Sequence, residues 1–326
     1  MDLADDEEIA TDRISDLPDE IISQKLLLSK SLLSKSWRLQ WTGVASFHIE
    51  SQWWLDFVDF VAFVDRLMLF KRSTINEFRL KWEDTRPTPT IGIIWVPRWL
   101  ALSPNLVVVD VGLFSQYENS YLARTMSIDL PDQLFTCKTL EILKLRGPFL
   151  VKVPSQEVEV CLPKLSVLEL NSVHFKSRGG KSLRMLLRGC PVLKSFRFER
   201  KHRFPSIHWW ISSASLKHLE IYLYNDEDDI MRIFAPHVNN HHCKLLIDTP
   251  ALEKLILTDQ LSAKISISGG SNLNEAELDI RCVDHLRDTD YRNSIVRLIQ
   301  GLSHVKILRL SDKTKQILSS STCQQL

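Results

Sequence analysis

A leucine-rich pattern recurs along most of the chain and limits the folds that it can adopt. The pattern is L-x-x-L-x-L or its apolar equivalent, as in TLEILKL. Strong copies have their apolar residues at Leu140, Leu143 and Leu145; Leu165, Leu168 and Leu170; Leu193, Phe196 and Phe198; Leu216, Leu219 and Ile221; and Leu252, Leu255 and Leu257. Weaker copies are Ile75, Phe78 and Leu80; Leu106, Val109 and Val111; Leu273, Ala276 and Leu278; and Val305, Leu308 and Leu310. A short strand of this kind has one apolar face, which it can bury only by stacking on its neighbours.

The spacing of the copies is typical of one kind of solenoid. Successive strong copies begin 25, 28, 23 and 36 residues apart, and irregular solenoids tolerate such insertions. We therefore predict an α/β fold, an irregular leucine-rich-repeat solenoid with parallel strands on one face and helices and loops on the other. The alternative is an ordinary α/β domain with several similar strands. The exposed strand residues, among them Lys144, Glu169, Arg197 and Glu220, show no pattern that identifies a ligand.

Prolines and helical segments accompany the copies. A proline comes shortly before the strand in four of them, where its missing N–H group does least harm; these are Pro104, Pro163, Pro191 and Pro250. Between strands, KSLRMLLRGC predicts a helix for which Gly189 suits the C-terminal cap, and RNSIVRLIQGL repeats this arrangement with Gly301. The apolar face of the first helix is predicted to contain Leu183, Leu186, Leu187 and Cys190.

Composition and charge narrow the classes of protein. Of the 326 residues, 44% are hydrophobic and 25% are charged, which is ordinary for a folded chain. The formal net charge is only +1, so we expect neither nucleic acid nor an anionic membrane as a partner. The first residues are acidic and lack the basic and apolar regions of a secretory signal. Residues 1–11 are predicted to be a disordered acidic tail.

The most apolar helical candidate runs from Trp53 to Phe70. It contains Asp56, Asp59 and Asp65, each of which is costly inside a bilayer, so we do not expect it to span a membrane. Its apolar residues follow the spacing of one buried helical stripe. That stripe is predicted to contain Trp54, Phe57, Val58, Val61, Val64 and Met68.

The spacing of polar residues predicts no catalytic residue, no cofactor and no metal site. The six cysteines form no CxxC pair and are expected to be reduced thiols, in the cytoplasm or the nucleus. HVNNHHCK, from His237 to Lys244, offers zinc-ligand types but lacks a second ligand pair, so a loop insertion is the better interpretation. Gly179-Gly180 and Gly269-Gly270 are interpreted as turns. The cluster Arg197, Arg200, Lys201, His202 and Arg203 is interpreted as a solvated basic edge rather than a nucleic-acid patch.

Residues 17–41, LPDEIISQKLLLSKSLLSKSWRLQW, have the features of a small helical contact module. Asp16 can cap a helix that begins at LPDE, where Asp19 and Glu20 lie at the positive end of the helix dipole. Apolar residues then follow at spacings of 7, 4 and 4, which gives one stripe on a continuous helix; they are Leu26, Leu33, Trp37 and Trp41. The stripe either contacts another protein or packs on the first repeats.

Several blocks together resemble one family. DRISDLPDEI, LLSKSWRLQW, FVAFVDRLMLF, LFTCKTLEILKL and LRGCPVLKSF occur in the order found in plant F-box/leucine-rich-repeat proteins of the FBD group. The resemblance implies an F-box that docks on the Skp adaptor of an SCF ubiquitin ligase, and through it on cullin, while the repeats hold a target protein. It implies that the adaptor is met by Leu17, Pro18, Ile21 and Ile22, with Leu33 and Trp37 supporting or extending that surface.

The chain departs from this family at both ends. Only Ile21 to Leu32 separate LPDE from LSKSW, and the family's spacing is longer by about seven residues, or roughly 10 Å of helix. Such a shortening leaves two alternatives open, an F-box that still binds the adaptor, though weakly, and one that has lost adaptor binding. After GLSHVKILRLSDKTKQIL, which resembles the family's last repeats, no complete FBD segment follows before Leu326. The last repeat is therefore expected to lack its cap.

The predicted organisation has three parts: an acidic tail at 1–11, a shortened F-box-like module at 12–50 and the solenoid at 51–326. The expected function is that of a substrate-recognition receptor in an SCF-type E3 ubiquitin ligase, without catalytic activity of its own. The alternative is a leucine-rich-repeat interaction scaffold that has lost ligase coupling because its F-box is truncated.

Overall fold

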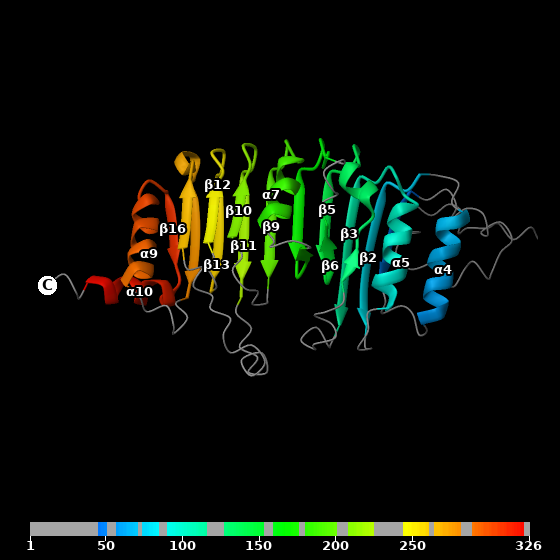
Figure 1. Cartoon of the computed structure of the whole chain (residues 1–326), viewed down its shortest axis with the longest axis horizontal. Coiled ribbons are helices and arrows are strands. Elements are labelled where there is room, and N and C mark those ends of the chain that lie inside the picture. Colours follow the sequence, from blue (N-terminus) through cyan, green and yellow to red (C-terminus); the bar gives the residue numbers. More distant parts are fainter. Residues whose placement is uncertain are drawn as a thin grey trace, which may run out of the picture.

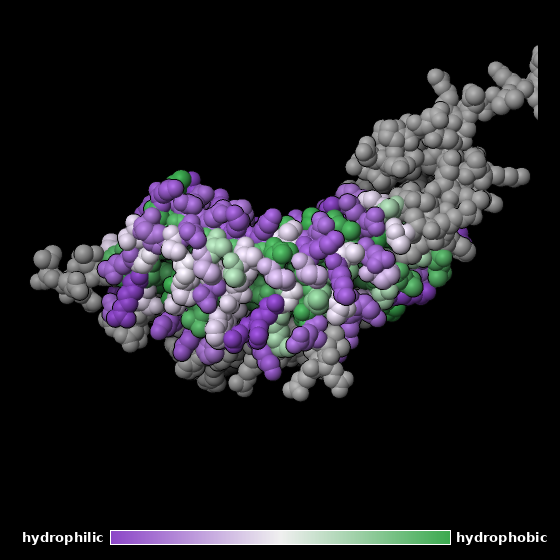
Figure 2. Space-filling model, turned by 90° about the horizontal axis from the view of Figure 1, so that it is seen from above, coloured by the Kyte–Doolittle hydropathy of each residue, from purple (hydrophilic) through white to green (hydrophobic). Residues whose placement is uncertain are grey.

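The computed structural model describes residues 45–50, 57–70, 74–84, 90–115, 127–152, 159–175, 180–200, 208–224, 244–260, 264–281 and 289–322. Within these ranges, ten strands form one large sheet in the order β1-β2-β3-β5-β7-β9-β11-β13-β15-β16, and every neighbouring pair is parallel. The strands follow one another along the molecule in chain order (Figure 1). Seen from above, the described residues form a shallow arc (Figure 2).

The bounds of the elements are as follows. The large sheet consists of β1 (Ser46–Glu50), β2 (Glu77–Asp84), β3 (Val108–Ser115), β5 (Ile142–Arg146), β7 (Val167–Asn171), β9 (Ser195–Arg200), β11 (His218–Leu223), β13 (Lys254–Asp259), β15 (Glu275–Ile280) and β16 (Ile307–Leu310). Two smaller sheets consist of β4 (Ile128–Asp129), β6 (Phe149–Val151) and β8 (His174–Phe175), and of β10 (His208–Ser212), β12 (Lys244–Asp248) and β14 (Lys264–Ser268). The helices are α4 (Phe57–Phe70), α5 (Thr90–Ala101), η4 (Asp132–Thr136), α7 (Gly180–Arg188), η5 (Gly270–Asn272), α9 (Thr289–Gly301) and α10 (Asp312–Thr322).

The repeated apolar residues form the core, which confirms the predicted solenoid. In the five strong copies, every residue of the pattern is at most 1% exposed. The register aligns equivalent residues of neighbouring strands, so that Leu143, Leu168 and Phe196 lie in one inward row. Each fully buried side chain of this size stabilises the fold by roughly 1.5–3 kcal/mol. The stacked rows therefore bury the apolar face that no single strand could bury alone.

Three of the four prolines lie inside tight turns that precede the strands. Each turn is closed by a hydrogen bond from the amide of the copy's first apolar residue: Leu165 to Leu162, Leu193 to Cys190 and Leu252 to Thr249. The proline is the second residue of each turn, a position that suits its fixed φ. The turn directs the first leucine of the copy into the core before the strand begins.

The smaller sheets form a second layer, where the sequence pattern predicted only helices and loops. The inward residues of β10 and β12 are buried, and Trp209 of β10 packs on Phe198 of the large sheet with ring centroids 4.9 Å apart. Phe175 of β8 lies 5.6 Å from the same tryptophan ring. The core is therefore enclosed between the large sheet on one side and small sheets and helices on the other.

Helix α4 buries a different stripe from the predicted one. Val61, Val64 and Met68 are buried as expected, but Val58 is 68% exposed, so that part of the prediction is wrong. The buried face is centred on Phe60, Val61 and Val64, and Val58 is rotated about 100° away from it at 3.6 residues per turn. Trp54 and the side chain of Phe57 lie outside the described residues.

Asp65 links α4 to α5. Its Oδ1 atom accepts a hydrogen bond of 2.9 Å from the indole Nε1–H of Trp99, and its Oδ2 atom lies 3.6 Å from Arg98. This contact gives the carboxylate inside an apolar helix a partner. Among the described residues, no helix has the length and apolarity needed to cross a membrane.

Two glycines stand at the C-terminal ends of helices, as predicted, but without the left-handed conformation that is common at such caps. Gly189 follows α7 and Gly301 is the last residue of α9, but neither has a positive φ. At Gly189 the constraint is space, because a Cβ would lie 2.5 Å from the Cγ1 atom and the carbonyl oxygen of Val160. A Cβ at Gly301 would meet no atom within 4 Å.

The two glycine pairs interpreted as turns differ. Gly269 has a φ of 76° and precedes η5, which fits a turn. Gly180 instead begins α7, so the interpretation of that residue as part of a turn is wrong. A Cβ at Gly180 would lie 1.8 Å from the carbonyl oxygen of His208. The glycine therefore lets the helix start directly against β10.

Helix α10 packs against α9 and β15 at the end of the large sheet. The buried hydroxyl of Thr314 accepts a hydrogen bond of 2.8 Å from the amide of Ile280 and donates to the carbonyl of Leu278. The inward residues of β16, Leu308 and Leu310, are only partly buried. The helix thus covers the end of the stack in part, which the expected lack of a cap did not anticipate.

The large sheet begins before the predicted start of the solenoid. Strand β1 pairs with β2 over its whole length, from Ser46 to Glu50, whereas residues 12–50 were assigned to the F-box-like module. The predicted tail and most of that module lie outside the described residues, so the three-part division stays a prediction.

The inward rows yield a stability prediction. We expect Leu219→Ala to lower the free energy of unfolding by about 2–5 kcal/mol, because it opens a cavity in the centre of the ladder. Ile307→Ala, at a side chain that is 48% exposed, is the control and should change it by at most about 0.5 kcal/mol. Urea denaturation followed by circular dichroism measures both; equal losses would contradict the assignment of the core.

Candidate interaction surface

The outward residues of the large sheet carry charges that alternate from strand to strand. The register places one residue from each of six neighbouring strands in a single line, called the charged row below. The charged row consists of Arg79, Asp110, Lys144, Glu169, Arg197 and Glu220. Adjacent strands lie about 4.8 Å apart, and opposite charges on directly facing residues stabilise a sheet. Attraction between neighbouring opposite charges therefore stabilises the row.

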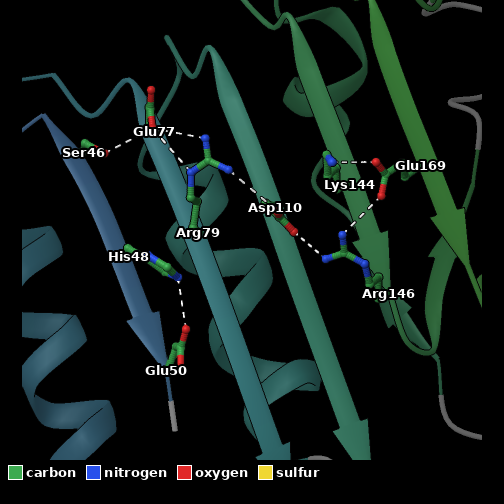
Figure 3. A network of polar contacts seen from close by, with 9 residues as sticks. All are labelled: Ser46, His48, Glu50, Glu77, Arg79, Asp110, Lys144, Arg146 and Glu169. Carbon is green, nitrogen blue, oxygen red and sulfur yellow. Dashed lines mark hydrogen bonds and ion pairs between the residues drawn. The ribbon is translucent and has the colours of Figure 1, made fainter. Parts of the chain in front are cut away.

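Ion pairs join the charged row to Arg146 on β5. Arg146 donates to Asp110 at 2.7 Å and to Glu169 at 3.2 Å, so it bridges the strands on either side of its own. Lys144 lies 2.5 Å from Glu169, and Arg79 lies 3.8 Å from Asp110. Figure 3 shows these side chains on one face of the sheet, with the helices behind it. This face is polar, but its charges are largely neutralised by one another.

A second cluster surrounds Arg197 on β9. Its guanidinium lies 4.5 Å from the ring centroid of Tyr222 and donates to Glu220 at 2.6 Å. Tyr222 stacks on Tyr224, and its hydroxyl donates to Glu220 at 3.3 Å. Partial burial raises the pKa of both tyrosines, and nearby carboxylates raise it further. Tyrosine and arginine are enriched at the energetic centres of protein interfaces, so this cluster is the best candidate anchor on the face.

The C-terminal strands continue the pattern of compensated charge. Glu275 pairs with Arg309 and with Lys254, and hydrogen bonds from these two side chains lower its pKa. Burial alone would raise the pKa of Asp279, but hydrogen bonds from Ser311 and Arg281 lower it. These carboxylates stay ionised at neutral pH, so the pairs persist there.

The structure bears on two interpretations of these residues. Lys144, Glu169, Arg197 and Glu220, for which the sequence showed no pattern that identifies a ligand, are consecutive members of the charged row. The interpretation as a solvated basic edge is wrong for Arg200. This residue is 6% exposed, and its guanidinium lies 5.1 Å from the ring centroid of Trp209. Alternation along β9 turns this arginine inward with Phe196 and Phe198. Lys201, His202 and Arg203 lie outside the described residues.

The residues predicted to bind the adaptor lie outside the part of the chain that the structure describes. They are Leu17, Pro18, Ile21, Ile22, Leu33 and Trp37. The segment from His237 to Cys243 also lies outside it. Their roles stay predictions.

Three of the cysteines are described, and all three are free thiols: Cys137, Cys161 and Cys190. The thiol of Cys190 donates to the carbonyl of Leu186 at 3.2 Å, and burial raises its pKa to about 12. It therefore stays protonated and acts as a small core residue. The described residues contain no group of three or more His, Cys, Asp or Glu side chains that could hold a metal ion.

Each leucine-rich copy forms one strand of the large sheet. The strands stack in parallel, with helices and small sheets on one side and a polar face on the other. This arrangement defines a leucine-rich-repeat solenoid protein. A family model described as "FBD-associated F-box protein At5g56370, LRR repeats" matches residues 96–316. The chain belongs to this family, the plant F-box/leucine-rich-repeat proteins of the FBD group. No solved structure matches it.

Three relatives from Arabidopsis thaliana illustrate the similarity. "F-box protein At4g09920" is 32% identical over 260 residues, which cover 76% of this chain and 74% of the relative. "F-box/LRR-repeat protein At4g14103" is 29% identical over 339 residues, with 95% and 80% covered. "Putative F-box/FBD/LRR-repeat protein At1g66290" is 28% identical over 336 residues, with 97% and 67% covered.

The bridging position of Arg146 yields a second prediction. Arg146→Met should lower the free energy of unfolding by about 1 kcal/mol, because Asp110 and Glu169 both lose a partner within a network. The control is Lys81→Met, which breaks the more exposed pair with Glu83 and should cost at most about 0.5 kcal/mol. Urea denaturation at low and high salt measures both. A loss at Arg146 no larger than that at Lys81 would contradict a coupled network.

Proposed function

We propose that this chain is the substrate-recognition subunit, the F-box receptor, of an SCF-type E3 ubiquitin ligase. Its N-terminal module binds the Skp adaptor, which connects it to cullin, and its repeats bind a target protein. The receptor contributes no reacting group. It raises the effective concentration of the target at the ligase, which accelerates transfer without any new chemistry.

One observation carries this proposal. The family model begins at residue 96, but the alignment to At1g66290, a relative named as an F-box protein, covers 97% of this chain. Only a few residues can lie outside that alignment, so it takes in most of residues 12–50. The similarity to F-box proteins is therefore not limited to the repeats, and it supports an F-box role for the N-terminal module.

The target side of the proposal is supported by the polar face of the large sheet. This face exposes a continuous row of paired charges and the cluster of Arg197, Tyr222 and Tyr224. A protein target can exchange ion pairs with the row and pack on the tyrosines. We place the complex in the cytoplasm or the nucleus, which suits the free thiols of the described cysteines.

A second candidate function follows from the short spacing between LPDE and LSKSW. Only Ile21 to Leu32 lie between them, and the loss of about two helical turns removes apolar surface that an F-box module needs. Under this alternative, the chain is an interaction scaffold that uses the same sheet face but has lost its coupling to the ligase.

Adaptor binding distinguishes the two functions. We expect the intact chain to co-purify with the Skp adaptor and cullin, and Leu17→Ala combined with Pro18→Ala to reduce that binding at least about tenfold, as loss of interface anchors does. Leu3→Ala combined with Ile9→Ala, in the predicted tail, is the control and should leave binding unchanged. If the intact chain binds no adaptor, the receptor function is refuted and the scaffold is favoured; stable binding to adaptor and cullin rules the scaffold out.

A further inference from the structure

The small sheet of β10, β12 and β14 presents a basic row to solvent. The register aligns His208 with Lys244 and Lys244 with Lys264, and all three side chains are exposed. Lys244 and Lys264 occupy directly facing positions on neighbouring strands, where like charges destabilise a sheet. The large sheet of the same molecule does the opposite, since its charged row alternates in sign. The basic row is therefore not a general property of this fold.

Helix α7 extends the positive charge beyond the sheet. Lys181, Arg184 and Arg188 are all exposed, and their spacing of three and four residues places them on one helical face. The helix packs against β10, and its first residue, Gly180, approaches the His208 carbonyl so closely that no Cβ would fit. The charges of the helix and of the strands consequently form one surface.

This small-sheet surface consists of Lys181, Arg184, Arg188, His208, Lys244 and Lys264, with Trp210 and Met185. Among the described residues, none of its basic side chains takes part in an ion pair. Helix α7 contains no acidic residue, and the acidic residue on these strands, Asp248, lies at the far end of β12, next to Ser268. A local excess of five Lys and Arg charges stands out in a chain whose net charge is +1.

The surface also has an apolar component. Trp210 is 37% exposed and Met185 is 36% exposed. The guanidinium of Arg184 lies 3.8 Å from the Trp210 ring centroid, which holds both side chains in a fixed arrangement. In Figure 1 the strands β10 and β12 lie between α7 and α9, and α9 packs against β14. The basic and apolar groups are thus framed by two helices.

We propose that the small-sheet surface binds an acidic peptide segment of a partner protein, with carboxylates at the basic row and an apolar residue beside Trp210. Charge complementarity carries the assignment, because six basic side chains gather there and, within the described ranges, no carboxylate pairs with any of them. The row spans only about 10 Å across three strands and adjoins exposed apolar side chains. A peptide that mixes acidic and apolar residues matches this better than a nucleic-acid backbone, which needs an extended basic groove.

This surface is separate from the one used in the proposed function. Phe198 of the large sheet and Trp209 of β10 pack on each other inside the core, so the outward faces of the two sheets lie on opposite sides of the molecule. The inference therefore does not depend on adaptor binding, and each can fail alone. It adds a second partner contact, or a second contact with the same partner.

Peptide binding by the full chain tests the proposal. The probe is a labelled peptide that alternates glutamate and serine around a central phenylalanine, and fluorescence anisotropy measures its dissociation constant at low salt. We expect saturable binding that weakens with added salt and that is lost when glutamines replace the glutamates. Lys244→Glu combined with Lys264→Glu should weaken it at least about tenfold, because two attractive contacts become repulsive.

The matched control is Lys306→Glu combined with Lys313→Glu, which changes two exposed lysines elsewhere and gives the same net charge. It should leave the affinity within about twofold of the parent chain. Circular dichroism confirms that both double variants are folded. The proposal is overturned if the parent chain shows no saturable binding, if both double variants lose the same affinity, or if oligothymidine binds more tightly than the glutamate peptide.

Discussion

The register of the parallel sheet is the constraint on which the rest of the structure depends. Inward residues such as Leu143, Leu168 and Phe196 must lie side by side for the apolar rows to be continuous. Since side chains alternate along a strand, the same register fixes which outward residues become neighbours. Charges of one sign would then repel across every strand pair. The alternating charged row satisfies both requirements, so core and surface are two consequences of one alignment.

Most of the fold could be predicted from the sequence because its signal is local and repeated. The spacing within each copy identifies Leu219 and Ile221 as buried without any knowledge of their partners. The charged row could not be recognised in this way, because its pattern runs across strands. Aligning the copies on their leucines would have placed Lys144, Glu169 and Arg197 in one column. The information was present, but only once the register was assumed.

Other misses have different physical causes. Arg200 looked like a surface residue because charged side chains are rarely buried, yet its position on β9 turns it toward Trp209. Gly189 follows α7, as its cap prediction requires, but the reason for a glycine there is the lack of space beside Val160. The sheet of β4, β6 and β8 was missed because β4 and β8 have only two residues each, too few for a periodic signal. In each case tertiary contact outweighed the local pattern.

The contrast between the two outward surfaces bears on how the molecule selects partners. On the large sheet, a target must displace existing ion pairs such as those of Arg146 with Asp110 and Glu169. Only a target whose surface charges alternate to match the charged row can form new ion pairs in their place. Such a face favours specificity over attraction. Within the part of the chain that the structure describes, the small-sheet surface has no ion pairs to displace, so it attracts acidic segments more generally and discriminates less. A rigid stack that carries both surfaces would combine capture on one side with selection on the other, and the core shared by the two sheets, where Phe198 packs on Trp209, holds the two surfaces at a fixed separation. Because that separation is fixed, a partner that reaches both surfaces gains effective concentration at the second from binding to the first.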